Sequence, residues 1–359
     1  MDTTIRVENP AELIAYIPHR LGFRPAGSIV VVSLRPSGGR VGLVARMDLD
    51  DVENGGATLL AQHMRGDGAE RVVQVVYDDR EPRPDARAWS VAHRVEKMLA
   101  AVVVDVVTWW VSPHGYGCLD CEPTRCCPEG GRPLTDLEST EVGAHMVVAG
   151  SSVADSRDAA FALPAVEPAR RRSVTAALRR ARLRRATAEP DWRRDGLESW
   201  RRAVGSARAD DEVPPATIGR VAAALEDIRV RDAVLLHLVR GDADLVDKTA
   251  AGSRAGDVAD RTGAAIAAIV DPDVGIAPPK ESLRPGVVVL EQVAASTGAH
   301  PRAAAGTLLA LVAWWQGDGG RAGERLREAL EADPAYRLAR LLDAALSAGL
   351  APGWLRSAR

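Results

Sequence analysis

The feature that most constrains the fold is a change in hydrophobic period near residue 164. Before it, short apolar runs such as SIVVVSL (Ser28–Leu34) and RVVQVVY (Arg71–Tyr77) alternate with segments of helical period. Such runs are typical of strands buried on both faces of a sheet. After it, apolar residues recur at helical spacing to the end of the chain. We therefore predict an α/β domain at residues 1–164, with a mixed sheet and flanking helices, and an all-helical domain at residues 165–359.

The last part of the helical domain carries a more specific pattern. Residues 302–350 contain a helical segment ending in two tryptophans, a turn QGDGG, a second helical segment ending at ADP, and a third beginning near Tyr336. This pattern is typical of a tetratricopeptide helix pair, but an independent solenoid needs about three repeats, and about one and a half are visible. We predict a tetratricopeptide-like packing unit within the helical domain.

Composition argues against several classes of protein. The chain has 359 residues, 26% of them charged, and a net charge of −3, so no overall field attracts it to nucleic acid or to an acidic membrane. The N-terminus lacks the basic start and continuous apolar core of a signal peptide. The longest apolar run, at residues 98–111, is interrupted by Asp105 and is shorter than the roughly 20 residues that cross a bilayer. We predict a cytoplasmic protein with no membrane association.

All the cysteines of the chain lie in one glycine- and proline-rich segment at residues 112–131. They are Cys118, Cys121, Cys126 and Cys127. In a reducing cytoplasm such a cluster binds a metal or reacts more often than it forms a structural disulfide. The first two have the C-x-x-C spacing of a zinc knuckle, so we predict that the cysteines hold zinc or a similar soft metal as a structural brace. Two alternatives stay open: reduced cysteines packed beneath the sheet, and a redox-active thiol whose pKa is lowered by Arg125.

A second group of polar residues lies around the first two predicted strands. PHRLGFRPAGS supplies His19, Arg20 and Ser28, and the end of the second strand supplies Arg46 and Asp48. A histidine, arginines and a carboxylate gathered at a sheet edge are able to bind an anionic ligand or to move protons. We predict a ligand-binding patch from these residues and assign no catalytic residue. The alternative is structural, with an Arg46–Asp48 ion pair and a His19 that caps a helix.

The start of the helical domain carries a run of arginines without an intervening acidic residue. The run comprises Arg170, Arg171, Arg172, Arg179, Arg180, Arg182, Arg184 and Arg185. On a helix these positions cover more than one face, which suits contact with phosphate groups. Arginine is also the ordinary surface cation of this chain, so we favour the alternative of a solvated helix paired with carboxylates from elsewhere.

Several stretches in combination resemble an actinobacterial family, the domain of unknown function 4192. They are LIAYIPHRLGFRPAGSIVVVSL with GRVGLVARMDL, CCPEGG after a tryptophan-rich strand, ADSRDA at residues 154–159, RVRDAVL at residues 229–235, and the ending LLALVAWWQGDGGRAGERLREALEADPAYRLARLL. The resemblance extends over essentially the whole chain. The family pattern has one cysteine shortly before the paired cysteines, which Cys121 matches, whereas Cys118 is additional. The resemblance implies these fold boundaries and the cytoplasm, and it implies no reaction.

These observations favour a cytoplasmic interaction or regulatory protein. In this hypothesis zinc braces the α/β domain and the helical domain holds a protein partner. One alternative is an enzyme that acts on a small anionic substrate at the carboxyl-terminal edge of the sheet, where open α/β sheets place their ligands. A weaker alternative is a nucleic-acid-binding protein that uses the arginine-rich helix. The sequence predicts no oligomeric state.

Overall fold

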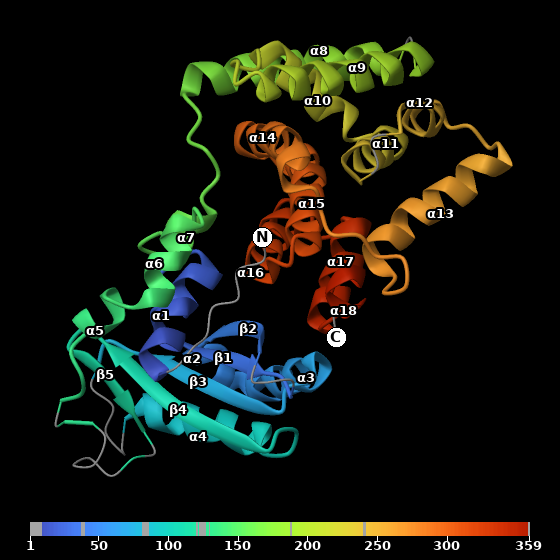
Figure 1. The fold of residues 1–359 in the computed structure, drawn as a ribbon. Coiled ribbons are helices and arrows are strands. Elements are labelled where there is room, and N and C mark those ends of the chain that lie inside the picture. Colours follow the sequence, from blue (N-terminus) through green and yellow to red (C-terminus); the bar gives the residue numbers. More distant parts are fainter. Residues whose placement is uncertain are drawn as a thin grey trace. The chain divides into compact units, whose positions relative to one another are not determined.

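The computed structural model describes residues 9–36, 40–80, 86–119, 121, 127–128, 130–186, 189–239 and 242–357. Contacts within the chain divide it into two compact units, Met1–Ala162 and Leu163–Arg359 (Figure 1). The sheet belongs to the first unit, and the described part of the second is helical. The predicted combination of a mixed sheet and many helices is confirmed.

The first unit is built on a five-stranded sheet in the order β2-β1-β3-β4-β5. The strands are β1 (Ser28–Leu34), β2 (Val41–Asp48), β3 (Arg71–Tyr77), β4 (Asp105–Ser112) and β5 (Gly115–Cys118). β3 and β4 are parallel, and the other neighbouring pairs are antiparallel. β1 therefore runs against both of its neighbours. Its first residue lies at the same edge of the sheet as the last residues of β2 and β3.

The alternation of side chains along β1 supplies two apolar cores, one on each face of the sheet. Ile29 and Val31 pack with α3 and α4, whereas Val30 and Val32 pack with α1. All four side chains are fully buried, as expected for a strand that is covered on both faces. The helices of this unit are α1 (Pro10–Leu21), α2 (Leu49–Asp51), the π-helical turn η1 (Val52–Gly56), α3 (Ala57–Asp67), α4 (Arg87–Leu99), α5 (Thr135–Glu138), α6 (Glu141–Val148) and α7 (Arg157–Phe161).

The edge strand β5 has no strand signal in the sequence, because GYGC is short and rich in glycine. Close approach explains its two glycines: a Cβ at Gly115 would lie 2.8 Å from the carbonyl oxygen of Arg132, and Gly117 packs against Trp110 of β4, as does Gly131 outside the strand. A Cβ at Gly117 would lie 2.8 Å from Nε1 of this indole, and a Cβ at Gly131 would lie 2.5 Å from Cη2. The predicted cysteine segment, residues 112–131, therefore begins at the end of β4 and contains β5.

Two contacts tie the first helix to the end of the unit. The Glu12 carboxylate accepts hydrogen bonds from the backbone N–H groups of Glu141 (3.2 Å) and Val142 (2.9 Å), in the first turn of α6. After α1, Phe23 forms a β-bridge with Ala154. The connection from α1 to β1 therefore lies beside the segment that leads into α7.

The second unit contains eleven described helices, and α15 is the most deeply buried of them. The helices are α8 (Pro168–Arg185), α9 (Glu189–Arg208), α10 (Pro215–Ala224), α11 (Ile228–Val239), α12 (Ala243–Ala251), α13 (Gly256–Val270), α14 (Lys280–Ser296), α15 (Ala299–Trp315), α16 (Gly319–Ala332), α17 (Arg337–Ser347) and α18 (Gly353–Ser357). Every residue of α15 from Ala303 to Trp315 is buried, and the helix contacts α10, α14, α16 and α17. In the described ranges, no helix has the length and the apolar character needed to cross a membrane.

Hydrogen bonds from three indole N–H groups connect the end of this unit to its core. Trp314 Nε1 donates to the carbonyl of Leu350 (2.7 Å), and Trp315 Nε1 donates to that of Ile276 (2.9 Å). Trp354 Nε1 in α18 donates to the carbonyl of Trp315 (2.8 Å). The tryptophan pair thus combines apolar burial with a hydrogen bond to irregular backbone, which is the usual arrangement for a buried indole.

Candidate functional site at the sheet edge

The register of the sheet places Ser28 between two other polar residues. It lies directly opposite Asp48 of β2 on one side and opposite Tyr77 of β3 on the other. Residues that face each other across strands project to the same face. Since Tyr77 belongs to the core formed with α1, all three side chains lie on that face. The fold thus brings together two sequence-predicted residues and one that the sequence analysis did not select.

Two hydroxyl groups are buried in this arrangement. Ser28 is 0% exposed and Tyr77 is 6% exposed. Within the described part of the chain, neither Ser28 Oγ nor the Tyr77 hydroxyl has a hydrogen-bond partner. Burial raises the pKa of Tyr77, so its hydroxyl keeps its proton at neutral pH and remains a donor. An unsatisfied buried polar group destabilises a fold by about 1–3 kcal/mol. Two such hydroxyl groups on neighbouring strands therefore require an explanation.

Arg46 and Asp48 complete the site from the neighbouring strand. Their ion pair, with Arg46 Nη2 2.6 Å from Asp48 Oδ1, is the pairing that the structural alternative anticipated. Arg46 Nη2 also donates to the carbonyl of Ala26 at 3.2 Å, whereas its buried Nε has no partner among the described residues. Asp48 is 42% exposed and lies 3.8 Å from Arg157 in the first turn of α7. The site therefore extends from buried hydroxyls to an exposed, charged rim.

His19 and Arg20, the other two predicted residues of the patch, are supplied by a helix. Both lie in the last turn of α1. His19 Nδ1 lies 3.1 Å from Ser151 Oγ, before α7. Burial, with a contribution from Arg24, lowers the pKa of His19, so the imidazole is neutral at pH 7. Arg20 is exposed. His19 thus contacts the segment between α6 and α7, whereas the ion pairs of Asp48 among the described residues are with Arg46 and Arg157.

Sequence reasoning missed Tyr77 and Arg157. Tyr77 ends an otherwise apolar strand, and a tyrosine in that place has a polar tip that needs a partner. The polar tip of Tyr77 is visible in the sequence. The residues beside Tyr77 depend on the strand order β2-β1-β3, which no local pattern specifies. Arg157 lies in the stretch ADSRDA, about 110 residues after Asp48 in the chain.

The cysteine segment is described in part. Cys118 lies at the end of β5, and its backbone N–H donates to Cys127 Sγ at 3.3 Å. Cys121 Sγ lies 3.6 Å from the carbonyl oxygen of Cys118. Cys126 falls outside the described residues. Among the residues that are described, no three histidine, cysteine or acidic side chains form a group able to hold a metal, and the zinc site stays a prediction.

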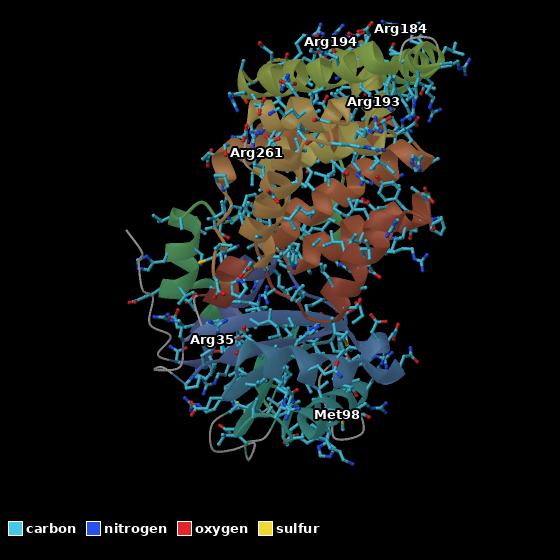
Figure 2. All side chains as sticks on the ribbon, turned by 90° about the vertical axis from the view of Figure 1, so that its right-hand side faces the viewer. Arg35, Met98, Arg184, Arg193, Arg194 and Arg261 are labelled. Carbon is cyan, nitrogen blue, oxygen red and sulfur yellow. The ribbon has the colours of Figure 1, made fainter. Side chains whose placement is uncertain are left out.

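The arginine run lies on α8 and makes several ion pairs with neighbouring elements. Figure 2 labels Arg184 of this helix together with Arg193 and Arg194 of α9. Arg184 pairs with Asp195 at 3.0 Å. Further pairs join Arg170 to Glu212, Arg182 to Glu226 and Arg185 to Asp227. Much of the arginine run therefore has carboxylate partners, as the alternative interpretation of a salt-bridged helix requires.

Comparison with known proteins gives one match. The family model described as "Domain of unknown function (DUF4192)" matches residues 10–353, which is nearly the whole chain and includes both units. No curated protein and no solved structure matches the chain. A family model that extends through the sheet, the cysteine segment and the helical unit shows that these parts occur together. The chain therefore belongs to the family of the domain of unknown function DUF4192.

Proposed function

We propose that the α/β unit binds a small molecule through a monoanionic group such as a carboxylate. The observation that carries this proposal is the set of three buried polar atoms without partners in the described structure: Ser28 Oγ, the Tyr77 hydroxyl and Arg46 Nε. All three are able to donate hydrogen bonds. They lie on adjacent strands at one edge of the sheet and on one face of it.

The charges around these donors favour one negative charge on the ligand. Arg46 and Arg157 contribute two positive charges, and Asp48 contributes one negative charge. A carboxylate accepts several hydrogen bonds at once, and those that it accepts from an arginine are stronger than neutral ones. The ligand group would give the buried hydroxyls their missing partners. The remainder of the molecule would extend toward the exposed rim at Asp48 and Arg157.

Binding is better supported than nucleophilic catalysis. A serine nucleophile needs a base within hydrogen-bond reach, whereas Ser28 Oγ has no partner among the described residues. The function that fits is a ligand-responsive regulatory or interaction protein. The proposal has two finer parts. Zinc braces the α/β unit at the cysteine segment, and a tetratricopeptide-like unit at residues 302–350 holds a protein partner. An enzyme acting on a small anionic substrate would use the same site.

The experiment is a ligand-observed NMR screen of the full-length protein against a library of small monocarboxylic acids. Binding of the hits should weaken about tenfold in Tyr77→Phe and in Ser28→Ala, since each loses a hydrogen bond to a charged group. The matched control is Ser33→Ala, a buried serine on the same strand whose side chain lies on the opposite face. The proposal fails if no carboxylic acid binds, or if hits bind the two site variants as well as they bind the control.

A further inference from the structure

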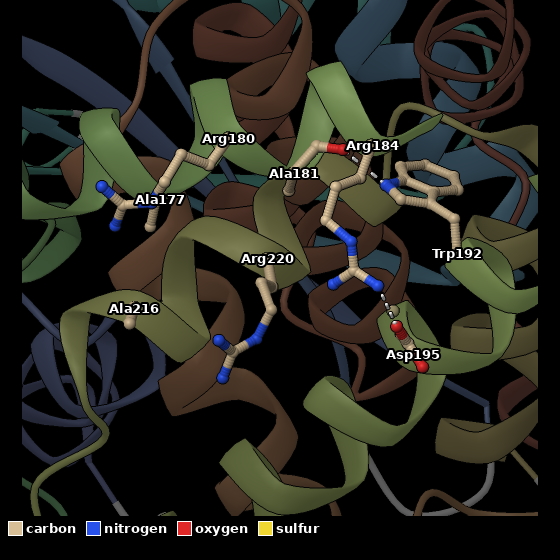
Figure 3. A pocket seen from close by; sticks show the side chains of 9 residues that line it. Ala177, Arg180, Ala181, Arg184, Trp192, Asp195, Ala216 and Arg220 are labelled. Atoms are coloured by element: carbon tan, nitrogen blue, oxygen red, sulfur yellow. Dashed lines mark hydrogen bonds and ion pairs between the residues drawn. The ribbon is translucent and has the colours of Figure 1, made fainter. Parts of the chain in front are cut away.

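The helical unit contains a pocket of about 200 Å³ among α8, α9 and α10 (Figure 3). Arg180 and Arg184 reach it from α8, and Arg220 reaches it from α10. Asp195 and Trp192 line it from α9. The remaining lining residues are alanines and a glycine, so the charged groups dominate its chemistry.

The positive charge of this pocket is incompletely neutralised. Arg184 pairs with Asp195, with Nη2 and Oδ2 3.0 Å apart. Arg180 makes no ion pair within the described ranges, and the bonds of Arg220 go to hydroxyl groups. Its Nε donates to Ser199 Oγ at 3.1 Å, and its Nη2 donates to Thr217 Oγ1 at 3.3 Å. Of the pocket's three arginines, Arg180 and Arg220 thus have no carboxylate partner within the part of the chain that the structure describes, which leaves two positive charges.

This excess distinguishes the pocket from other arginines of the unit. On the same α8 helix, Arg182 is paired with Glu226, and that hydrogen bond raises the pKa of Arg182. The pKa of Arg220 shifts in the opposite direction. Burial and the nearby charges of Arg202 and Arg184 lower its pKa, although Asp195 acts in the opposite direction. Ser199 and Thr217 hold the Arg220 guanidinium in place without cancelling its charge.

The opposite side of the pocket is rigid and apolar. Trp192 Nε1 donates to the carbonyl of Ala181 at 2.7 Å, which fixes the indole against α8. The guanidinium of Arg185 covers its ring, 5.0 Å from the ring centroid. At Gly196, a Cβ would lie 2.6 Å from the Cβ of Ala224, so glycine is required where α9 approaches α10. These contacts form a preorganised wall, which reduces the entropy lost on binding.

We propose that this pocket binds a small phosphate monoester. Such a group carries between about −1.5 and −2 charges at pH 7, which matches the two uncompensated positive charges. An arginine fork binds two phosphate oxygens at once, and Arg180 of α8 and Arg220 of α10 both line this pocket. Drug-sized ligands occupy about 300–1,000 Å³, so this smaller pocket suits a phosphate group with a few carbon atoms. Each phosphodiester of a nucleic acid carries one charge only, which fits less well.

The test is isothermal titration calorimetry of the full-length protein with glycerol 3-phosphate, and with glycerol as the uncharged control. Arg220→Gln should weaken binding of glycerol 3-phosphate at least tenfold, because a charged hydrogen bond is lost. Asp195→Asn should strengthen it several-fold, because the competing carboxylate disappears. The matched control is Arg182→Gln, on the same helix but paired with Glu226, which should bind as the wild type does.

The opposite directions of the two pocket variants separate a binding site from a folding defect, and thermal melts of each variant check the fold. The proposal is overturned if glycerol 3-phosphate does not bind, or if Arg220→Gln and Arg182→Gln behave alike. It is also overturned if a single-stranded oligonucleotide binds with a steep salt dependence while the monoester does not. Tyr77→Phe should leave phosphate binding unchanged, so this result does not depend on the carboxylate site of the first unit.

Discussion

At the scale of single residues, the hydroxyl of Tyr77 gives a direct test of the sheet-edge site. A buried tyrosine hydroxyl normally has a hydrogen-bond partner, and removing such a bonded hydroxyl destabilises the fold by about 1 kcal/mol. Here the hydroxyl has no partner in the described structure. Tyr77→Phe should therefore leave the free energy of unfolding unchanged or raise it by up to about 1 kcal/mol in ligand-free protein. Urea unfolding measures this, and a clear loss of stability would show that the hydroxyl is already bonded.

A second residue-scale prediction concerns the buried ion pair between Arg35 and Asp67. Asp67 is 5% exposed, and its carboxylate accepts from Arg35 at 2.7 and 3.2 Å and from the Leu43 N–H at 3.0 Å. Removing one partner of a buried pair leaves the other unsatisfied, so Asp67→Asn should destabilise the fold by about 3 kcal/mol. The control is Asp50→Asn in the exposed pair with Arg87, which should have no measurable effect.

The same carboxyl makes stability depend on pH. Burial acts to raise the pKa of Asp67, but hydrogen bonds from Arg35 and from the Leu43 N–H outweigh it, and the pKa lies below the ordinary 3.8. Its contribution is therefore complete above pH 3.8 and is lost as the pH falls through the lower value of the folded state. The stability difference between wild type and Asp67→Asn should narrow in that acid range. A difference that stays constant with pH would contradict the assignment.

At the scale of elements, runs with a strong local signal could be predicted and elements that depend on packing could not. The expected strands Ser28–Leu34 and Arg71–Tyr77 match β1 and β3, because continuous β-branched residues require burial on both faces. The predicted second strand is β2, which ends at Asp48, and α2 begins at Leu49. β5 could not be predicted, because its glycines are required by close contacts with the Arg132 carbonyl and the Trp110 indole. Ser28, Arg46 and Asp48 could be placed together from a predicted hairpin, whereas Tyr77 required the strand order.

The cysteine segment carries a prediction at this scale. Cys127 is buried, while Cys118 and Cys121 are partly exposed. In native protein Cys127 should therefore be alkylated more slowly than the other two, and denaturation should remove the difference. Peptide mass spectrometry over a time course measures each thiol.

Elemental analysis of the same untagged sample tests the zinc brace. If the brace exists, zinc is present and Cys127→Ser releases it and lowers the melting temperature. A metal-free sample with a buried Cys127 would favour the alternative of packed thiols. Rapid alkylation of Cys127 in native protein would contradict the structure of this segment.

At the scale of the whole molecule, the two units have separate apolar cores. Leu163 and the helices after it belong to one core, and the two faces of the sheet supply the others. We expect a fragment of residues 163–359 to unfold cooperatively on its own, since it forms a compact unit with its own apolar core. Circular dichroism during urea unfolding tests this. A fragment that is helical but melts without a transition would show that the first unit is needed to complete the fold.

The deep burial of α15 has a consequence for how the protein is made. Domains fold as units, and the N-terminal one folds first during synthesis. The first unit can fold once residue 162 has left the ribosome. The second unit must wait, because α10 and α14 emerge before α15, the buried helix that both of them contact. A nascent chain that stops before Trp315 therefore presents a finished sheet domain joined to helices whose apolar faces are still uncovered, and it is such chains that chaperones would hold.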